Sequence, residues 1–278
     1  MAQAMEKART VFFVSDRTGI TAETLGHSLL TQFDGVRFRQ VTVPFLSTVD
    51  KAEAFVERVR QTHQEEGEKP IIFSTLIADD IRELVAESEC VFLDFFDAFI
   101  GPLEKELGVK SSHTSGRAHG MHDEANYTTR IDAMNFALAN DDGVTTKNYE
   151  KADVILVGVS RSGKTPTCLY LALHYGLYAA NYPLTEEELE TGRFPQSLLP
   201  FRDKLFGLTI DAGRLQQIRT ERRPDSRYAS AGQVNLELRQ AENMFQTTNV
   251  PFTNTTNSSI EEIATTIIHE TGIKRRFF

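Results

Sequence analysis

Eight consecutive residues in the second half of the chain have the types and spacing needed to hold a chain of phosphates. Segment 158–165 reads GVSRSGKT, a full match to the pattern G-x-x-x-x-G-K-[ST]. In such a loop the glycines let the backbone curl until several N–H groups point at phosphate oxygens. The helix that follows adds the positive end of its dipole. The candidate nucleotide-binding residues are therefore Gly158, Val159, Ser160, Arg161, Ser162, Gly163, Lys164 and Thr165.

The last two residues of this loop are the ones expected to act on the phosphates. Lys164 would contact the transferring phosphoryl group, and the hydroxyl of Thr165 would bind Mg²⁺. Pro166 fits the first turn of the following helix, where its missing N–H costs nothing. Arg161 either adds positive charge to the phosphates or points to solvent. The loop predicts binding of a nucleoside diphosphate or triphosphate and phosphoryl transfer; the alternative is a glycine-rich turn with an exposed lysine.

Three further residues are candidate catalytic groups. Asp211 follows an apolar run and could orient the water shell of the metal, or it could cap the next helix. His119 and Asp142 lie in a polar, histidine-rich stretch and could supply a general acid or base. The alternative for these two is a merely solvated loop. The histidine spacing fits no common zinc signature.

A cluster of arginines lies in the segment IRTERRPDSRYAS. Guanidinium groups bind phosphate through paired hydrogen bonds, so Arg222, Arg223 and Arg227 are candidates for holding phosphate or a phosphorylated partner. The alternative is a solvated helix end paired with Glu221 and Asp225.

Composition limits the class of partner. The 278 residues carry a formal net charge of −9, which argues against nucleic acid as the main partner. The only cysteines, Cys90 and Cys168, are in apolar stretches without ligand spacing, so we expect buried free thiols and a reducing compartment. Because no apolar run is long enough for a signal peptide or a membrane span, we expect a cytoplasmic protein without a membrane partner.

Hydrophobic periodicity indicates the elements that position these residues. In the first part of the chain, strands are expected at 11–14, 36–43, 71–73 and 90–96, and helices at 21–33, 52–64 and 77–86. In the last part, strands are expected at 153–157 and 205–210, and helices at 165–175, 215–222, 236–245 and 259–271. This alternation predicts an α/β fold: an N-terminal parallel-sheet lobe (1–110), a connecting segment (111–150) with a helical pattern at 127–140, and a P-loop kinase-like α/β lobe (151–278).

Several segments together resemble a known family. They are VFFVSDRTGITAE, HGM, DDG, GVSRSGKTPTCLYLA, AANYPL, KLFGLTID and ERRPDSRYAS. Over essentially the whole chain the sequence resembles the bacterial phosphoenolpyruvate synthase regulatory proteins, which belong with the pyruvate, phosphate dikinase regulatory proteins. Two residues depart from the pattern: Arg17 stands where the family usually has glycine, and Asn140 stands where histidine commonly precedes DDG. The second departure leaves Asp141 and Asp142 as the candidates there.

The resemblance implies a bifunctional enzyme that acts on another protein. One activity would phosphorylate a threonine of the synthase with ADP as donor, releasing AMP and inactivating the target. The other would remove that phosphate by attack of inorganic phosphate, releasing pyrophosphate. The resemblance also implies a homodimer. The form SRSGKTPT followed by AANYPL favours the synthase as target. The alternatives are the same chemistry on the dikinase, a small-molecule P-loop kinase, and a nucleotide-gated regulatory module without phosphoryl transfer.

Overall fold

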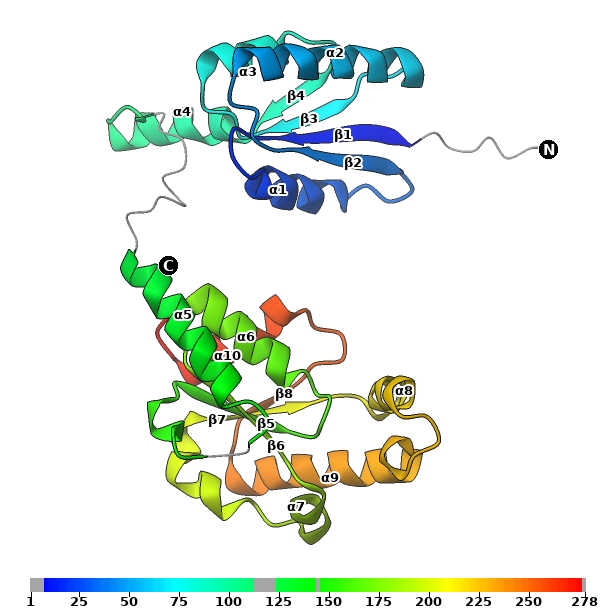
Figure 1. Ribbon diagram of the computed structural model, residues 1–278, viewed down its shortest axis with the longest axis vertical. Helices are drawn as coiled ribbons and strands as arrows, with labels where there is room; N and C mark the ends of the chain where they lie inside the picture. Colours follow the sequence, from blue (N-terminus) through cyan, green and yellow to red (C-terminus); the bar gives the residue numbers. More distant parts are fainter. Residues whose placement is uncertain (1–7, 113–123, 144–145, 277–278) are drawn as a thin grey trace, which may run out of the picture. The chain divides into compact units, whose positions relative to one another are not determined.

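The chain packs into two compact α/β units, residues 1–120 and 121–278. The computed structural model describes residues 8–112, 124–143 and 146–276, and Figure 1 shows its helices and strands. Each unit contains one four-stranded parallel sheet with helices on both faces. The predicted α/β class with two lobes is thereby confirmed.

The sheet of the first unit has its first strand near the middle. Its strands, in spatial order, are β2 (Phe38–Val43), β1 (Arg9–Val14), β3 (Ile71–Ser74) and β4 (Val91–Asp94). One face packs against α1 (Ile20–Leu30), and the other against α2 (Val49–Glu66) and α3 (Asp79–Ala86) (Figure 1). β1 is buried on both faces: Phe12 and Val14 join the core under α2 and α3, whereas Val11 and Phe13 join the core under α1. Such a continuous apolar run is typical of a central parallel strand.

The strand predicted at 90–96 is wrong at its last two residues. β4 ends at Asp94, whose side chain accepts a hydrogen bond from the backbone N–H of Asp97 at 2.8 Å and so begins helix α4 (Phe95–Leu107). Phe95 and Phe96 are therefore helical. A capping aspartate inside an apolar run ends a strand that periodicity alone extends.

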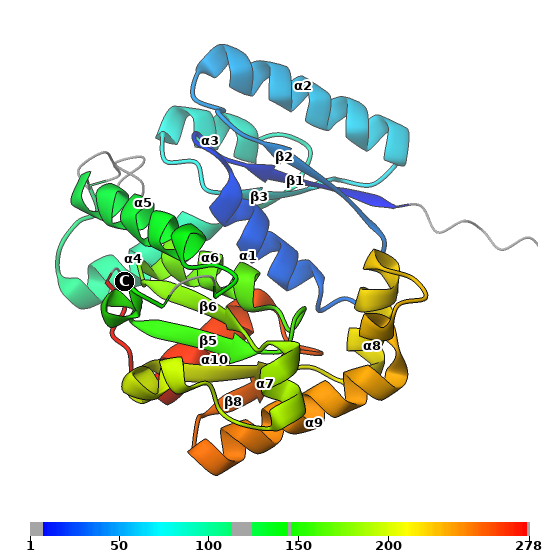
Figure 2. The same ribbon diagram turned by 60° about the horizontal axis from the view of Figure 1, so that its bottom comes forward.

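The second unit has the same strand order. Its strands, in spatial order, are β6 (Ala179–Pro183), β5 (Val154–Gly158), β7 (Leu205–Thr209) and β8 (Phe252–Asn254). The helices on one face are α5 (Glu124–Ala139), α6 (Lys164–Tyr175) and α10 (Ile260–Thr271). Those on the other face are α7 (Glu186–Thr191), α8 (Ala212–Arg222) and α9 (Ala231–Thr248), and α7 lies beside α9 (Figure 2).

Strand β5 again divides the core into two clusters. Ile155 and Val157 pack under the helices that include α9, whereas Val154 and Leu156 pack under α6 and α10. The 3₁₀ helices of this unit are Tyr149–Lys151 (η2), Gln196–Lys204 (η3) and Arg227–Ala229 (η4). Helix α5, which lies within the segment assigned to a connection, packs on α6 as part of the second unit.

The described part of the chain has no helix long and apolar enough to cross a membrane. Both cysteines are free: Cys168 is buried as expected, whereas Cys90 is only partly buried.

Candidate active site

The phosphate-loop motif forms the turn between β5 and α6. Gly158 ends the strand where it approaches β7: a Cβ atom there would lie 2.3 Å from the carbonyl oxygen of Leu208, so only glycine fits. Gly163 has φ 89° and immediately precedes the helix, a left-handed conformation that glycine adopts without strain. The two glycines of the motif therefore have separate structural reasons, one for close packing and one for backbone direction.

Lys164 lies in the floor of the site. Its side chain is buried, and Nζ donates to the carbonyl oxygen of Val159 at 2.7 Å. Burial lowers the pKa of Lys164 to about 8, because a charged ammonium loses hydration there. The nearby carboxylates of Asp141 and Asp142 oppose this lowering of the pKa, and a phosphate oxygen in contact with the ammonium would oppose it further.

Thr165 belongs to a small polar cluster beside the lysine. Its hydroxyl donates to Oδ1 of Asp141 at 3.0 Å. The amide of Asn181, on β6, donates to the same carboxylate oxygen at 2.6 Å and to the Thr165 hydroxyl at 3.1 Å. A hydroxyl and a carboxylate held side by side are oxygen ligands of the kind that Mg²⁺ prefers.

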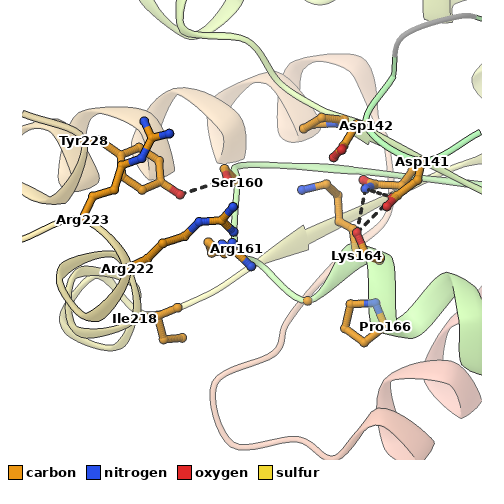
Figure 3. A pocket seen from close by; sticks show the side chains of 14 residues that line it. Asp141, Asp142, Ser160, Arg161, Lys164, Pro166, Ile218, Arg222, Arg223 and Tyr228 are labelled. Atoms are coloured by element: carbon orange, nitrogen blue, oxygen red, sulfur yellow. Dashed lines mark hydrogen bonds between the residues drawn. The ribbon is translucent and has the colours of Figure 1, made fainter.

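A cavity of about 750 Å³ opens in front of this loop. Ser160, Arg161 and the start of α6 form its floor, Asp141 and Asp142 lie on one side, and the end of α8 with Tyr228 lies on the other (Figure 3). Asn181 also lines the cavity, in contact with Asp141. Within the described residues, the backbone N–H groups of Arg161, Gly163 and Lys164 have no acceptor in the protein. Unpaired N–H groups at the start of a helix form an anion-binding site.

The arginines of IRTERRPDSRYAS have three different environments. Arg222 and Arg223 line the cavity and make no ion pair with any residue that the structure describes. Arg227 does not line it; its guanidinium pairs with Glu186 at 3.3 Å and Glu190 at 2.9 Å on α7. Arg219 is fully buried. The structure thus brings two of the three predicted arginines to the phosphate loop.

The predicted acids are also separated. Asp142 lines the cavity, and its backbone is left-handed with φ 63°. Arg161, which also lines the cavity, has φ 76°. Strained backbone of this kind in a non-glycine residue is frequent at functional sites. Asp211 precedes α8, but its side chain makes no capping hydrogen bond. The Asp211 carboxylate instead accepts a hydrogen bond from the Asn254 amide at 2.8 Å, and Asp211 does not line the cavity. His119 lies outside the described residues.

The structure adds four residues to the cavity that the motifs did not identify as site residues: Asn181, Pro183, Ile218 and Tyr228. Asn181 and Tyr228 occur in the quoted segments AANYPL and ERRPDSRYAS, so the resemblance was the only signal for them. Asp141 was one of two acids left as candidates, and it is the one that contacts Thr165.

Comparisons with known proteins show the family to which the chain belongs. The sequence profile of the kinase/pyrophosphorylase family matches residues 11–268. A protein of Laribacter hongkongensis is 54% identical over 98% of this chain and 100% of its own length. Proteins of Legionella pneumophila (strain Corby) and Halorhodospira halophila are 53% and 55% identical over 96% and 98% of this chain, covering 99% and 100% of their own lengths. All three bear the name "Putative phosphoenolpyruvate synthase regulatory protein". The phosphate loop and its cavity lie within the matched range, and the chain belongs to the kinase/pyrophosphorylase family.

Proposed function

We propose that the protein regulates phosphoenolpyruvate synthase by two opposite phosphoryl transfers. In one, a threonine of the synthase receives the β-phosphoryl group of ADP; in the other, inorganic phosphate removes it. The observation that carries the proposal is the composition of the cavity. A phosphate loop with a buried lysine faces Arg222 and Arg223, and neither arginine forms an ion pair with another described residue. The target follows the names of the relatives.

The nucleotide would lie on the loop of residues 158–165. The unpaired N–H groups of Arg161, Gly163 and Lys164 would hold its phosphate oxygens, and the ammonium of Lys164 would neutralise charge that grows during transfer. With ADP as donor, the β-phosphoryl group occupies the reactive position. ATP would carry an additional phosphate into the space of the acceptor, so it should bind but serve poorly as donor.

The Thr165 hydroxyl and the Asp141 carboxylate would hold Mg²⁺. The donor set fits the ion because both groups offer oxygen and the Asn181 amide orients the carboxylate. When bound, the ion supplies positive charge to the phosphate oxygens. Asp141 would then have the metal-orienting role, one of the two roles that the sequence left open for Asp211, which lies off the cavity.

The two arginines would hold the second anion. In the forward direction a threonine oxygen bonds to the β-phosphorus of ADP, the bond from that phosphorus to the bridging oxygen breaks, and AMP leaves; Asp142 would accept the hydroxyl proton. In the reverse direction an oxygen of inorganic phosphate bonds to the phosphorus of phosphothreonine, and the threonine oxygen leaves and takes a proton. Arg222 and Arg223 would bind the inorganic phosphate or the phosphothreonine, so that pyrophosphate forms at the loop.

The destination of a labelled phosphoryl group tests this proposal. Purified protein is incubated with ADP labelled on its β-phosphate, either alone, with the synthase or with the dikinase, and a Lys164→Met variant is the control. Label on a synthase threonine supports the proposal. Label on the dikinase alone, label on a small molecule, or binding without transfer would each replace it with one of the alternatives. A cytoplasmic homodimer is part of the same proposal, and sedimentation of the purified protein tests its oligomeric state.

A further inference from the structure

A fully buried arginine lies directly behind the phosphate loop. Arg219, on α8, has no exposed side-chain surface, and its Nη2 atom is 2.7 Å from Oε2 of Glu237 on α9. The other oxygen of Glu237 accepts from the side chain of Gln233 at 3.0 Å. A buried ion pair is expensive to desolvate, and replacing one by apolar residues is often neutral or stabilising. This pair therefore calls for an explanation other than stability.

The remaining contacts of Arg219 point to that explanation. Nη2 also donates to the backbone carbonyl of Ser160 at 3.1 Å, across 59 positions of sequence. Ser160 is in the middle of the phosphate loop. In a trans peptide the carbonyl oxygen and the next N–H point in opposite directions. Arg219 therefore turns the N–H of Arg161 away from the buried guanidinium, and that N–H is one of the unpaired donors of the loop.

Tyr228 makes a second connection between Arg219 and the same loop residue. The guanidinium carbon lies 4.2 Å from the centroid of the Tyr228 ring, and Nη1 donates to the Tyr228 carbonyl at 3.1 Å. The Tyr228 hydroxyl is 3.0 Å from Oγ of Ser160. Tyr228 lines the cavity (Figure 3). The carbonyl and the hydroxyl of Ser160 are therefore both fixed by the same buried arginine, the carbonyl directly and the hydroxyl through the tyrosine.

Arg219 also orients the helix that carries the two cavity arginines. Arg222 and Arg223 follow it by three and four positions at the end of α8, about one helical turn away. Because Arg219 binds α8 to Ser160 and to α9, we expect it to limit the movement of this end of the helix and of the two arginines that it carries.

We infer that Arg219 and Glu237 are positioning residues: they hold the phosphate loop and the Arg222–Arg223 pair in the relative geometry that a nucleotide and a second phosphate require together. This inference rests on the proposed function. Neither residue touches the ligands; they act through Ser160, Tyr228 and α8. Loss of the pair should weaken nucleotide binding and reduce the turnover rate even where the protein stays folded.

The test is a double variant that removes both charges, Arg219→Met with Glu237→Gln, in which the introduced amide keeps an oxygen for Gln233. Binding of Mg-ADP is titrated well below the melting temperature, and kcat and KM are measured in both directions. The control is Arg276→Met, which removes the Arg276–Asp153 pair (2.9 Å) of the same unit, outside the cavity. We expect the double variant to bind ADP about tenfold more weakly, the change that loss of two hydrogen bonds of ordinary strength produces. The control should bind ADP as the wild type does.

A second variant makes the result independent of folding. Tyr228→Phe keeps the ion pair and removes only the hydroxyl near Ser160; we expect an ADP affinity about threefold to fivefold lower. When Tyr228→Phe is added to the folded double variant, the additional loss of ADP affinity should be smaller than the loss that Tyr228→Phe causes in the wild-type protein. The two effects should overlap because both changes act through Ser160.

Normal ADP affinity in either folded variant would overturn the inference. Failure of the wild-type protein to bind ADP would instead overturn the proposed function. A third outcome would overturn the inference but leave the proposed function standing. In it, the wild-type protein binds ADP, Lys164→Met does not, and both the Arg219→Met/Glu237→Gln variant and Tyr228→Phe bind it normally.

Discussion

The two units share a strand–turn–helix arrangement, and among the described residues only the second unit places a lysine and a threonine directly after the glycine of the turn. Both sheets have the strand order second–first–third–fourth. In both, the first strand is followed five residues later by a left-handed glycine, Gly19 with φ 80° and Gly163 with φ 89°, and then by a helix. After the glycine, the first unit continues Ile20-Thr21 and the second continues Lys164-Thr165.

The difference lies in what each turn places next to the helix. The side chain of Ile20 is 62% exposed, whereas Lys164 is 4% exposed and faces the cavity. The first turn is tied to the loop after β2 by two backbone hydrogen bonds, from Phe45 to the carbonyl of Arg17 and from Leu46 to that of Ser15. The comparison teaches that the strand order and the glycine provide only a backbone, so the proposed chemistry depends on the lysine, the acids and the arginines that the second unit adds.

The largest expected effect comes from exchanging the residue after the glycine. We expect Lys164→Met to reduce ADP-dependent transfer roughly 100- to 1,000-fold, the usual loss when one preorganised charged partner is removed. The equivalent change in the first unit, Ile20→Met, should leave the rate unchanged. Initial rates with β-labelled ADP measure both. A rate in Lys164→Met near that of the wild type would show that the loop does not carry the transfer.

Removing the two cavity arginines should give the next largest effect. With Arg222→Ala and Arg223→Ala together, phosphate-dependent reactivation should fall about 10- to 100-fold, which corresponds to the net loss of one hydrogen bond to a charged group, roughly 1.5–3 kcal/mol. ADP affinity should change less. Arg227→Ala is the matched control because that arginine pairs with glutamates away from the cavity. An equal loss of ADP affinity would place the two arginines on the nucleotide instead.

The two glycines offer a direct contrast between stability and binding. Alanine at either position carries the strain of a left-handed backbone, about 1–2 kcal/mol. At Gly19 the new Cβ would also lie 2.9 Å from Cγ2 of Thr42, whereas at Gly163 it meets no atom within 4 Å. Gly19→Ala should therefore lower the melting temperature more, and only Gly163→Ala should weaken ADP binding, by about tenfold. Calorimetry and a binding titration separate the two effects, and equal ADP affinities would contradict the contrast.

The smallest effect is a dependence of binding on pH. The free protein holds the pKa of Lys164 at about 8 because the side chain is buried. Bound phosphate stabilises the ammonium and raises that pKa. ADP affinity should thus be highest below pH 8 and fall above it, by at most about tenfold per pH unit. Titrations from about pH 7 to about pH 9.5 measure this slope, and Lys164→Met should be flat over the range. A slope that persists in the variant would assign the titration to another group.

Sequence alone predicted the parts of the site that are contiguous in the chain. The loop from Gly158 to Thr165 is a local pattern, and apolar runs located β1, β5 and β7. Strand β6 was not predicted because Ala179, Ala180 and Asn181 are too small or too polar to read as a buried strand, although all three are buried.

Contacts between distant segments could not be read from the sequence. The acid beside Thr165 is Asp141, 24 positions earlier, because the turn that follows α5 returns to the start of α6. Asp211 is a candidate metal-orienting acid because it follows a neighbouring strand. In the structure, however, its carboxylate accepts a hydrogen bond from the Asn254 amide. The arginines of one short segment reach three environments because the end of α8 and the 3₁₀ turn η4 point them in different directions.

The identity of the donor and the products tests the central claim most directly. Wild-type protein and the synthase are incubated with purified ADP or ATP, and the phosphorylated synthase is then treated with inorganic phosphate. The account predicts AMP and phosphothreonine from ADP, little transfer from ATP together with inhibition by it, and pyrophosphate on reactivation. Efficient transfer of the γ-phosphoryl group of ATP, or reactivation that consumes no inorganic phosphate and releases no pyrophosphate, would contradict it.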